Sequence, residues 1–235
     1  MVILPNRRKI FRSLPSSDST DPYWANVVLL LHCDGANGSA TFIDSSSVGR
    51  TMTAGGDAQI STTNPKFGTG CANFDGTGDK ITAADSDDWN FGTGDFTVEG
   101  WCYPTSASAS QTIIAQWNTG TNNSFFFGIG AGYGLYINGF LAIGYSAWPS
   151  ANNWHHFAFT RSGVNLRLFI NGTQSGSTVN IGSGAINNSA SLLSIGRDDY
   201  GNPFYSGKMD DIRITKGVAR YTTNFTVPTA PFPDS

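Results

Sequence analysis

The chain has 235 residues, enough for one ordinary domain or two small ones with a proper hydrophobic core. Charged residues make up only 13% of it, whereas Gly, Ser, Thr and Asn together account for 95 residues. Because those four residue types favour turns and caps over helices, the composition argues against an ordinary helical or α/β domain. An aromatic content of 13% argues against disorder, and the formal charge of −3 argues against nucleic-acid binding. No run of 18 apolar residues is present, so no membrane span is expected.

The N-terminus differs from the rest of the chain in its charge. Arg7, Arg8, Lys9 and Arg12 place four of the 14 basic residues within the first twelve positions. No apolar core follows these charges, so the segment does not match a secretory signal. We predict an arm over residues 1–25 and one domain over residues 26–235. A partly ordered arm and a docking segment for another protein are the two interpretations of this stretch.

Short apolar or alternating runs, separated by Gly, Asn, Pro and Asp, continue through the rest of the chain, which is typical of an all-β sandwich. Asn138-Gly139 and Asn171-Gly172 each stand between apolar residues and predict tight hairpin turns. The expected strands, in chain order, are Val27–His32, Gln59–Ser61, Cys71–Phe74, Ile81–Ala84, Phe96–Tyr103, Gln111–Trp117, Phe125–Ile129, Leu135–Ile137, Trp154–Arg161, Leu166–Ile170, Leu192–Ile195 and Lys208–Ile214. Helical turns are expected only at Asp85–Asn90 and Val218–Tyr221.

The cysteines and histidines do not form a metal-binding pattern. Cys33, Cys71 and Cys102 cannot all pair within one chain, and their spacing matches no zinc site. Each cysteine stands in a strand-like run, so we predict buried free thiols, as expected after synthesis in a reducing cytoplasm. His155 and His156 are strand neighbours that point to opposite faces, and therefore they cannot chelate one ion together.

Five segments carry a resemblance to a known family. They are Val27–Ser46, Phe74–Trp101 (FDGTGDKITAADSDDWNFGTGDFTVEGW), Trp154–Thr173 (WHHFAFTRSGVNLRLFINGT), Leu193–Arg197 and Phe204–Pro233. In this order they resemble the laminin-G-like, concanavalin A-like jelly rolls, especially those of phage tail and virion proteins and of marine bacterial surface proteins. The resemblance implies a two-sheet antiparallel β-sandwich that binds sugar or protein, with a calcium ion in some members.

Catalysis is not expected, although glucanases share this superfamily. Those enzymes carry Glu-x-Asp-x-Glu on one strand, and the nearest match here is Asp95–Glu99, in which Thr97 replaces the central acid. Glu99 is also the only glutamate of the chain, so a pair of glutamates cannot form. The glycine-rich run Gly128–Gly134 lies between two strands with no helix after it, which predicts a hairpin and not a phosphate-binding loop.

Calcium is the only cofactor that the sequence suggests. Asp34, Asn37 and Asp44 flank the first long loop and offer the oxygen ligands that calcium prefers. Aspartates in β-turns also have an ordinary role in turn structure, so both interpretations stay open.

Two polar loops contain aromatic residues of the kind that stack on sugar rings. If these loops lie at the same end of the sandwich, they form a patch of aromatic and polar side chains, a composition typical of ligand clefts. The alternative is that Trp148 and Tyr200 cap the edge of the core. The candidate ligand-binding residues are Tyr145, Trp148, Asp198, Asp199, Tyr200 and Asn202.

These observations lead to two functional hypotheses. The first is a non-catalytic binding or structural protein on a virion, a phage tail adhesin or head-decoration protein with weak glycan binding. Such a protein is made in the host cytoplasm, contacts other structural proteins and is present in many copies or as a homo-oligomer. The alternative is a secreted or cell-surface bacterial lectin-like domain whose partner is a carbohydrate.

Overall fold

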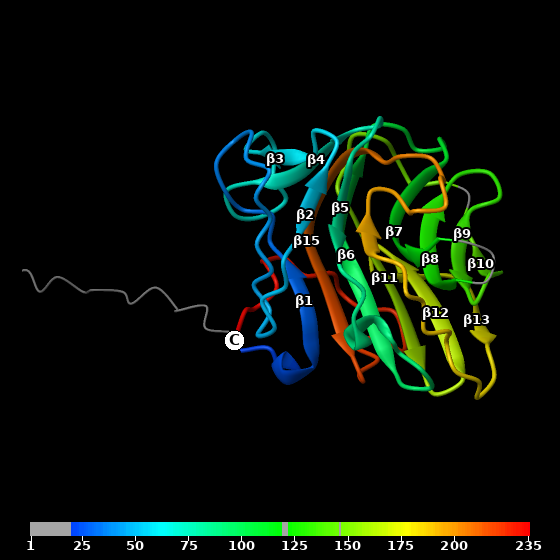
Figure 1. The fold of residues 1–235 in the computed structure, drawn as a ribbon. Coiled ribbons are helices and arrows are strands. Elements are labelled where there is room, and N and C mark those ends of the chain that lie inside the picture. The colour runs from blue at the N-terminus through cyan, green and yellow to red at the C-terminus, as the bar shows by residue number, and fades with distance from the viewer. Residues whose placement is uncertain (1–19, 119–121, 146) are drawn as a thin grey trace, which may run out of the picture.

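Two antiparallel β-sheets lie face to face in the computed structural model, which describes residues 20–118, 122–145 and 147–235 (Figure 1). This confirms the predicted all-β sandwich. The first sheet, of eight strands, has the order β13-β12-β11-β6-β15-β4-β3, and β1 also pairs with β15. Its members are β1 (Val27–Leu31), β3 (Gln59–Ser61), β4 (Cys71–Asp75), β6 (Phe96–Pro104), β11 (His155–Ser162), β12 (Asn165–Ile170), β13 (Thr173–Asn180) and β15 (Ser206–Lys216).

The second sheet, of seven strands, has the order β10-β9-β8-β7-β14-β5-β2. Its members are β2 (Thr53–Gly55), β5 (Lys80–Ala83), β7 (Gln111–Trp117), β8 (Asn123–Ile129), β9 (Gly134–Ile137), β10 (Phe140–Gly144) and β14 (Leu193–Ile195). The helical elements of the described chain are two short 3₁₀ turns, η1 (Trp24–Asn26) and η2 (Asp87–Trp89). No helix in these parts of the chain is long and apolar enough to cross a membrane.

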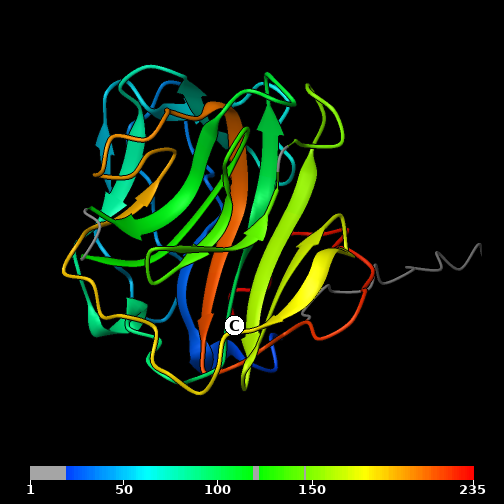
Figure 2. The ribbon, with the colours of Figure 1, turned by 90° about the vertical axis from the view of Figure 1, so that its right-hand side faces the viewer.

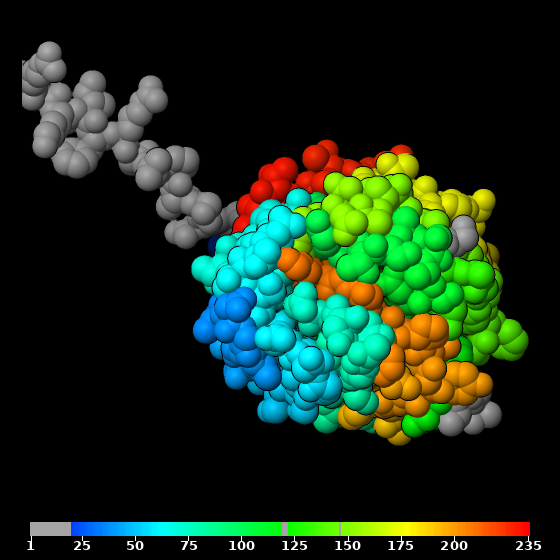
Figure 3. Space-filling model, turned by 90° about the horizontal axis from the view of Figure 1, so that it is seen from above, coloured from blue at the N-terminus to red at the C-terminus, as the bar shows by residue number. Residues whose placement is uncertain are grey.

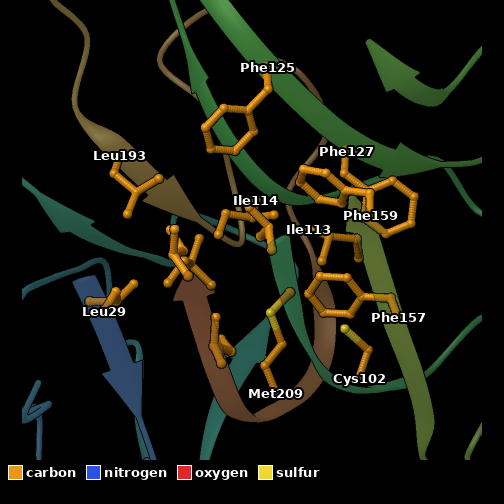
Figure 4. Close-up of a cluster of buried hydrophobic side chains, with 14 of the residues drawn as sticks. Leu29, Cys102, Ile113, Ile114, Phe125, Phe127, Phe157, Phe159, Leu193 and Met209 are labelled. Atoms are coloured by element: carbon orange, nitrogen blue, oxygen red, sulfur yellow. The ribbon is translucent and has the colours of Figure 1, made fainter. Parts of the chain in front are cut away.

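The core lies between the sheets, where alternate residues of each strand point inward. Figure 4 shows Phe125 and Phe127 of β8 facing Phe157 and Phe159 of β11, and all four side chains are fully buried. The Phe127 ring centroid lies 5.5 Å from that of Phe157. The cysteines Cys33, Cys71 and Cys102 are buried and free, as predicted.

The outer face of the first sheet is covered by the C-terminal segment. Tyr221 and Phe225 stack with ring centroids 3.6 Å apart, and both rings pack against Phe169 of β12. Thr160 of β11 donates a hydrogen bond to the Tyr221 carbonyl at 2.8 Å. This face is therefore closed by the chain itself.

The described chain begins beside its own C-terminus (Figure 1). The Asp21 amide donates to the Ser235 carbonyl at 2.8 Å, and the Asp21 carboxylate accepts hydrogen bonds from Arg213 and Arg220. Asp21 is 6% exposed. The segment just before residue 26, which the sequence assigned to the arm, is thus held on the sandwich. The predicted assembly residues Arg7, Arg8, Lys9 and Arg12 lie outside the described residues.

Candidate functional site

An open cleft lies on the outer face of the second sheet, over β7, β8 and β9. Its volume is about 340 Å³, near the lower end of the range of about 300–1,000 Å³ that small-molecule sites occupy. Five of its seven lining residues are aromatic. They are Trp117, Phe126, Gly132, Tyr133, Tyr136, Tyr200 and Asn202. Seen from above, the segment after β14 (orange) lies against the segments around β7 to β9 (green) (Figure 3).

Strand pairing brings the floor of the cleft together. Phe125 and Phe127 point into the core, so Phe126 between them points outward. Ala115 and Tyr136 lie opposite Phe126 on the two neighbouring strands, and opposite residues of an antiparallel pair share a face. One outward row crosses the whole sheet through Thr53, Thr82, Ser194, Ala115, Phe126, Tyr136 and Leu141. The cleft lies over the aromatic part of this row.

The floor rings pack directly on one another. The Trp117 ring centroid lies 5.9 Å from that of Tyr136 and 6.1 Å from that of Phe126, both with edge-to-face geometry. Tyr133 packs on Phe126 at 5.5 Å. Separations of about 4.5–7 Å are those of touching aromatic rings, so no ligand atom fits between them. Phe126 is only 2% exposed, so the surface offered to a ligand consists of the partly exposed rings of Trp117, Tyr133 and Tyr136 packed around it.

One wall of the cleft is the loop between β14 and β15, and Asp198 fixes its shape. The buried Asp198 carboxylate accepts hydrogen bonds from the Gly201 and Asn202 amides at 3.1 and 3.0 Å, and from the Asn202 side chain. The backbone of the loop is also tied to β7, because the Asp199 amide donates to the Trp117 carbonyl at 3.2 Å. This wall is preorganised before any ligand arrives.

The opposite wall is the glycine-rich hairpin between β8 and β9, as the sequence predicted. Gly130 has a φ of +107°, and a Cβ atom there would lie 2.4 Å from the Cα of Ser110, so only glycine fits. The turn carries Tyr133, whose hydroxyl donates to the Asn202 side-chain oxygen at 2.9 Å. This hydrogen bond joins the two walls. Burial raises the pKa of Tyr133, and the charge of Asp198 raises it further.

Tyr200 stands at the mouth of the cleft with 61% of its surface exposed. Within the described chain, no other aromatic ring packs against it. Asn202, beside it, uses its side-chain oxygen for Tyr133 and one amide hydrogen for Asp198, which leaves the second amide hydrogen for a ligand. An exposed ring next to a fixed amide is the combination that recognises both the apolar face and the hydroxyl groups of a sugar.

The structure divides the six predicted ligand-binding residues into separate groups. Tyr200 and Asn202 line the cleft, and Asp198 supports it from below. Asp199 forms an ion pair with Lys80 of β5, with Oδ1 and Nζ 3.1 Å apart, and does not line the cleft.

Trp148 and Tyr145 do not form the expected exposed patch. Trp148 is 2% exposed, and its ring stacks on His155 and contacts Phe127 on the core side of the second sheet. Tyr145 packs edge-on against Trp148, and burial raises its pKa to about 12. The assumption that Trp148 offers a free ring face was wrong, because the proline-containing loop folds inward over the core. The alternative, a cap on the core edge, describes Trp148 correctly.

The three predicted calcium ligands serve the backbone instead. Asp34 accepts hydrogen bonds from the Thr69 and Gly70 amides, and Asn37 accepts one from the Thr62 amide. Asp44 accepts hydrogen bonds from the amides of Leu30, Ser46 and Arg50. The side chains of Asp34, Asn37 and Asp44 therefore each hold a different segment of the backbone. Turn and loop structure accounts for all three side chains.

Three other aspartates bring their carboxylates close together in the described part of the chain. Carboxylate oxygens of Asp57, Asp75 and Asp79 lie within 4.8 Å of one another. Asp79 is 1% exposed and accepts hydrogen bonds from the amides of both Asp57 and Asp75 at 2.8 Å. Burial raises the pKa of Asp79. The cluster is accounted for by these turn hydrogen bonds.

Glu99, the only glutamate, lies buried on the outer face of the first sheet. Its environment does not suit a catalytic acid. Its carboxylate accepts hydrogen bonds from Arg213 at 2.7 Å and from Tyr221 at 2.8 Å, and His156 lies 3.4 Å away. Burial opposes its ionisation, but the charge of Arg213 and the contact with His156 outweigh that effect and lower its pKa to about 2. A fully buried carboxylate held in its charged form cannot donate a proton to a glycosidic oxygen.

Two stacked antiparallel sheets define the class of all-β sandwich domains. Residues 75–220 match the sequence profile of the concanavalin A-like lectin/glucanases superfamily, and the chain belongs to that superfamily. No curated protein sequence matches the chain.

Solved structures with a similar fold include the binding domains of toxins and a domain of an arabinanase. The binding domain of Paraclostridial Mosquitocidal Protein 1 aligns with a TM-score of 0.58 at 17% identity, over 84% of this chain and 50% of that one. The botulinum neurotoxin serotype D ligand-binding domain, solved with N-acetylneuraminic acid, aligns at 0.56 and 18%, over 84% and 49%. This chain therefore spans about half the length of those toxin domains. Domain 4 of AbnA, a GH43 extracellular arabinanase from Geobacillus stearothermophilus solved with arabinotriose, aligns at 0.54 and 16%, over 82% and 93%.

At 16–18% identity these solved structures show the fold alone, and none of them connects the chain with a virion. The sequence did not single out the floor residues Trp117, Phe126, Tyr133 and Tyr136. One signal was present, because Phe125, Phe126 and Phe127 are consecutive in a strand, so one of them must point away from the core.

Proposed function

We propose that this protein is a non-catalytic carbohydrate-binding domain, and that the cleft over β7, β8 and β9 is its binding site. The observation that carries the proposal is the exposed Tyr200 ring beside the amide of Asn202, above a packed aromatic floor. Sugars present apolar C–H faces and a rim of hydroxyl groups, and this surface is complementary to both. Relatives solved with arabinotriose and with N-acetylneuraminic acid add support for a saccharide ligand.

The absence of catalysis is part of this proposal. No carboxylate lines the cleft, and the two aspartates nearest to it are engaged by Asn202 and by Lys80. Hydrolysis of a glycosidic bond generally requires two carboxylates on either side of that bond. The cleft can therefore hold a sugar but has no groups that cleave it.

As a further part of the proposal, the domain acts at a cell or particle surface, where glycans are displayed. A lectin-like surface domain is better supported than the virion hypothesis. Attachment through the arm, with several copies acting together, is a further part of the proposal, because avidity can raise weak binding by about 10²–10⁴.

Binding to immobilised oligosaccharides, including arabinotriose, tests the proposed function. We expect Tyr200→Ala to weaken binding about tenfold, which corresponds to about 1.4 kcal/mol, and Tyr200→Phe to retain most of it. Phe140→Ala is the matched control, because Phe140 is 77% exposed on β10 and does not line this cleft. Equal binding by Tyr200→Ala and Phe140→Ala would contradict the assignment of the site.

A further inference from the structure

The charges around the cleft point to a class of sugar. Every side chain that lines it is uncharged. The nearest acidic groups belong to the same loop as Tyr200: Asp198 is buried beneath Asn202, and Asp199 lies next to Tyr200 in the chain. Asp198 also contributes to the raised pKa of Tyr133, after burial, so its negative field reaches into the cleft.

The two cations near this loop do not line the cleft. Lys80 pairs with Asp199 at 3.1 Å. The guanidinium of Arg197 lies over the Phe204 ring, 4.0 Å from its centroid, and Arg197 does not line the cleft. An incoming carboxylate would thus lose its hydration against aromatic rings without gaining a cationic partner, and an unpaired buried charge is costly.

From this distribution of charge, and on the basis of the proposed function, we infer that the cleft selects neutral sugars and discriminates against sialylated and uronic-acid-containing glycans. The aromatic floor takes the apolar face of the sugar ring. The free amide hydrogen of Asn202 donates to one hydroxyl group of the sugar. The Tyr133 hydroxyl donates its own hydrogen bond to Asn202, so its oxygen lone pairs can accept from a second sugar hydroxyl.

A quaternary ammonium group is the competing ligand for an aromatic site. Such a cation is enclosed between separate ring faces. The floor rings here touch one another at 5.5–6.1 Å, which leaves a surface and not an enclosure. The geometry favours a flat neutral ring over a spherical cation.

Matched pairs of probes test this inference by NMR titration of the full chain at millimolar ligand. The pairs are lactose with 3′-sialyllactose, and galactotriose with trigalacturonate, and choline is added as a third arm. We expect each neutral member to bind at least tenfold more tightly than its acidic partner, and Tyr200→Ala to weaken this binding about tenfold. Asp199→Asn leaves Lys80 without its partner and should reduce the ratio of neutral to acidic sugar affinity. Asp87→Asn, the same change at an exposed position of η2, is the control and should leave this ratio unchanged.

The outcomes separate this inference from the proposed function. Tighter binding of the acidic members, abolished by Tyr200→Ala, overturns the neutral preference and leaves the carbohydrate site in place. Choline binding that Tyr200→Ala abolishes, without sugar binding, overturns both and assigns the cleft to cations. If no probe binds, or if Tyr200→Ala has no effect, the carbohydrate site itself is wrong.

Discussion

Asp210 of β15 is a buried acid on the outer face of the first sheet, where it lies opposite Trp101 and is covered by the segment with Lys66 and Phe67. Its carboxyl group is fully buried, with Oδ2 accepting hydrogen bonds from the Lys66 and Phe67 amides at 2.8 and 3.1 Å. Oδ1 has no hydrogen-bond partner in the structure. Burial raises the pKa of Asp210 from the ordinary value of 3.8 to about 8, and the charge of Asp211 adds to the effect. Around neutral pH this side chain is therefore mostly protonated in the folded protein and ionised in the unfolded chain.

The sign of the resulting pH dependence follows from proton binding. Between pH 3.8 and about 8 the folded state holds a proton that the unfolded state has lost, so the free energy of unfolding falls as the pH rises through this window. Each pH unit corresponds to about 1.4 kcal/mol for one group, which gives a ceiling of about 6 kcal/mol. Local relaxation around the ionised group reduces this figure, and we expect about 3 kcal/mol.

Replacing Asp210 with asparagine removes this titration while keeping the shape of the side chain. The amide oxygen can accept from Lys66 and Phe67, and the amide nitrogen takes the place of the protonated oxygen. Asp210→Asn should therefore match the wild type near pH 4 and exceed its free energy of unfolding by about 3 kcal/mol at pH 9.

Urea unfolding followed by tryptophan fluorescence, repeated at intervals from pH 4 to pH 9, measures this difference. Asp87→Asn, at an exposed aspartate, is the control and should run parallel to the wild type throughout. If the free energy of unfolding of Asp210→Asn changes with pH as that of the wild type does, or is lower than the wild-type value at pH 9, the ionisation of Asp210 does not destabilise the folded state. Either result refutes the reasoning.

Three more predictions concern other parts of the structure. Glu99→Gln should lower the free energy of unfolding at pH 7 by about 3 kcal/mol, because it removes one of the two carboxylates that pair with the buried Arg213 and leaves only Asp21. Since the pKa of Glu99 is depressed to about 2, this deficit should shrink in urea melts as the pH falls from about 4 toward 2. Trp148→Ala should lower the free energy of unfolding by about 3–5 kcal/mol, measured by thermal unfolding, because it leaves a cavity beside Phe127. A variant that loses sugar binding but keeps its full stability would contradict the burial of Trp148. Asp198→Ala should weaken sugar binding in titrations at least tenfold while costing about 1–2 kcal/mol in stability, because the loop amides lose their acceptor.

Central strands could be predicted from the sequence, whereas of the strands at the ends of the two sheets only β3 was predicted. β6, β8 and β11 are buried on both faces and are rich in aromatic and apolar residues, so their positions follow from residue type. β13 is an edge strand of mostly exposed polar residues, and nothing in Thr173–Asn180 distinguishes it from a loop. β2 and β10, the edges of the second sheet, were also missed: β2 has only three residues, and β10 is apolar but largely exposed. Val218–Tyr221, expected as a helical turn, forms no helix because its backbone is used to cover the first sheet.

The loop of the candidate site could be predicted from neighbouring residues in the sequence, but its floor could not. The loop with Asp198, Tyr200 and Asn202 was recognised from its composition, because aromatic and acceptor side chains lie close together in the chain. The floor depends on strand register, which brings Trp117 beside Tyr136, nineteen positions later in the chain. Only the pairing of three strands makes these rings neighbours.

The two outer faces of the sandwich explain why the binding surface lies on one sheet and not on the other. On the first sheet the outward residues include Glu99, His156 and Arg213, and the C-terminal segment covers them with Tyr221, whose hydroxyl donates to Glu99. A ligand could reach that face only by displacing the covering segment and its hydrogen bonds. On the second sheet no such segment of the described chain covers the aromatic part of the outward row, so these rings can line a cleft. Its surroundings, the β8–β9 hairpin and the β14–β15 loop, can therefore hold a cleft open over aromatic rings while the rest of the sandwich stays closed.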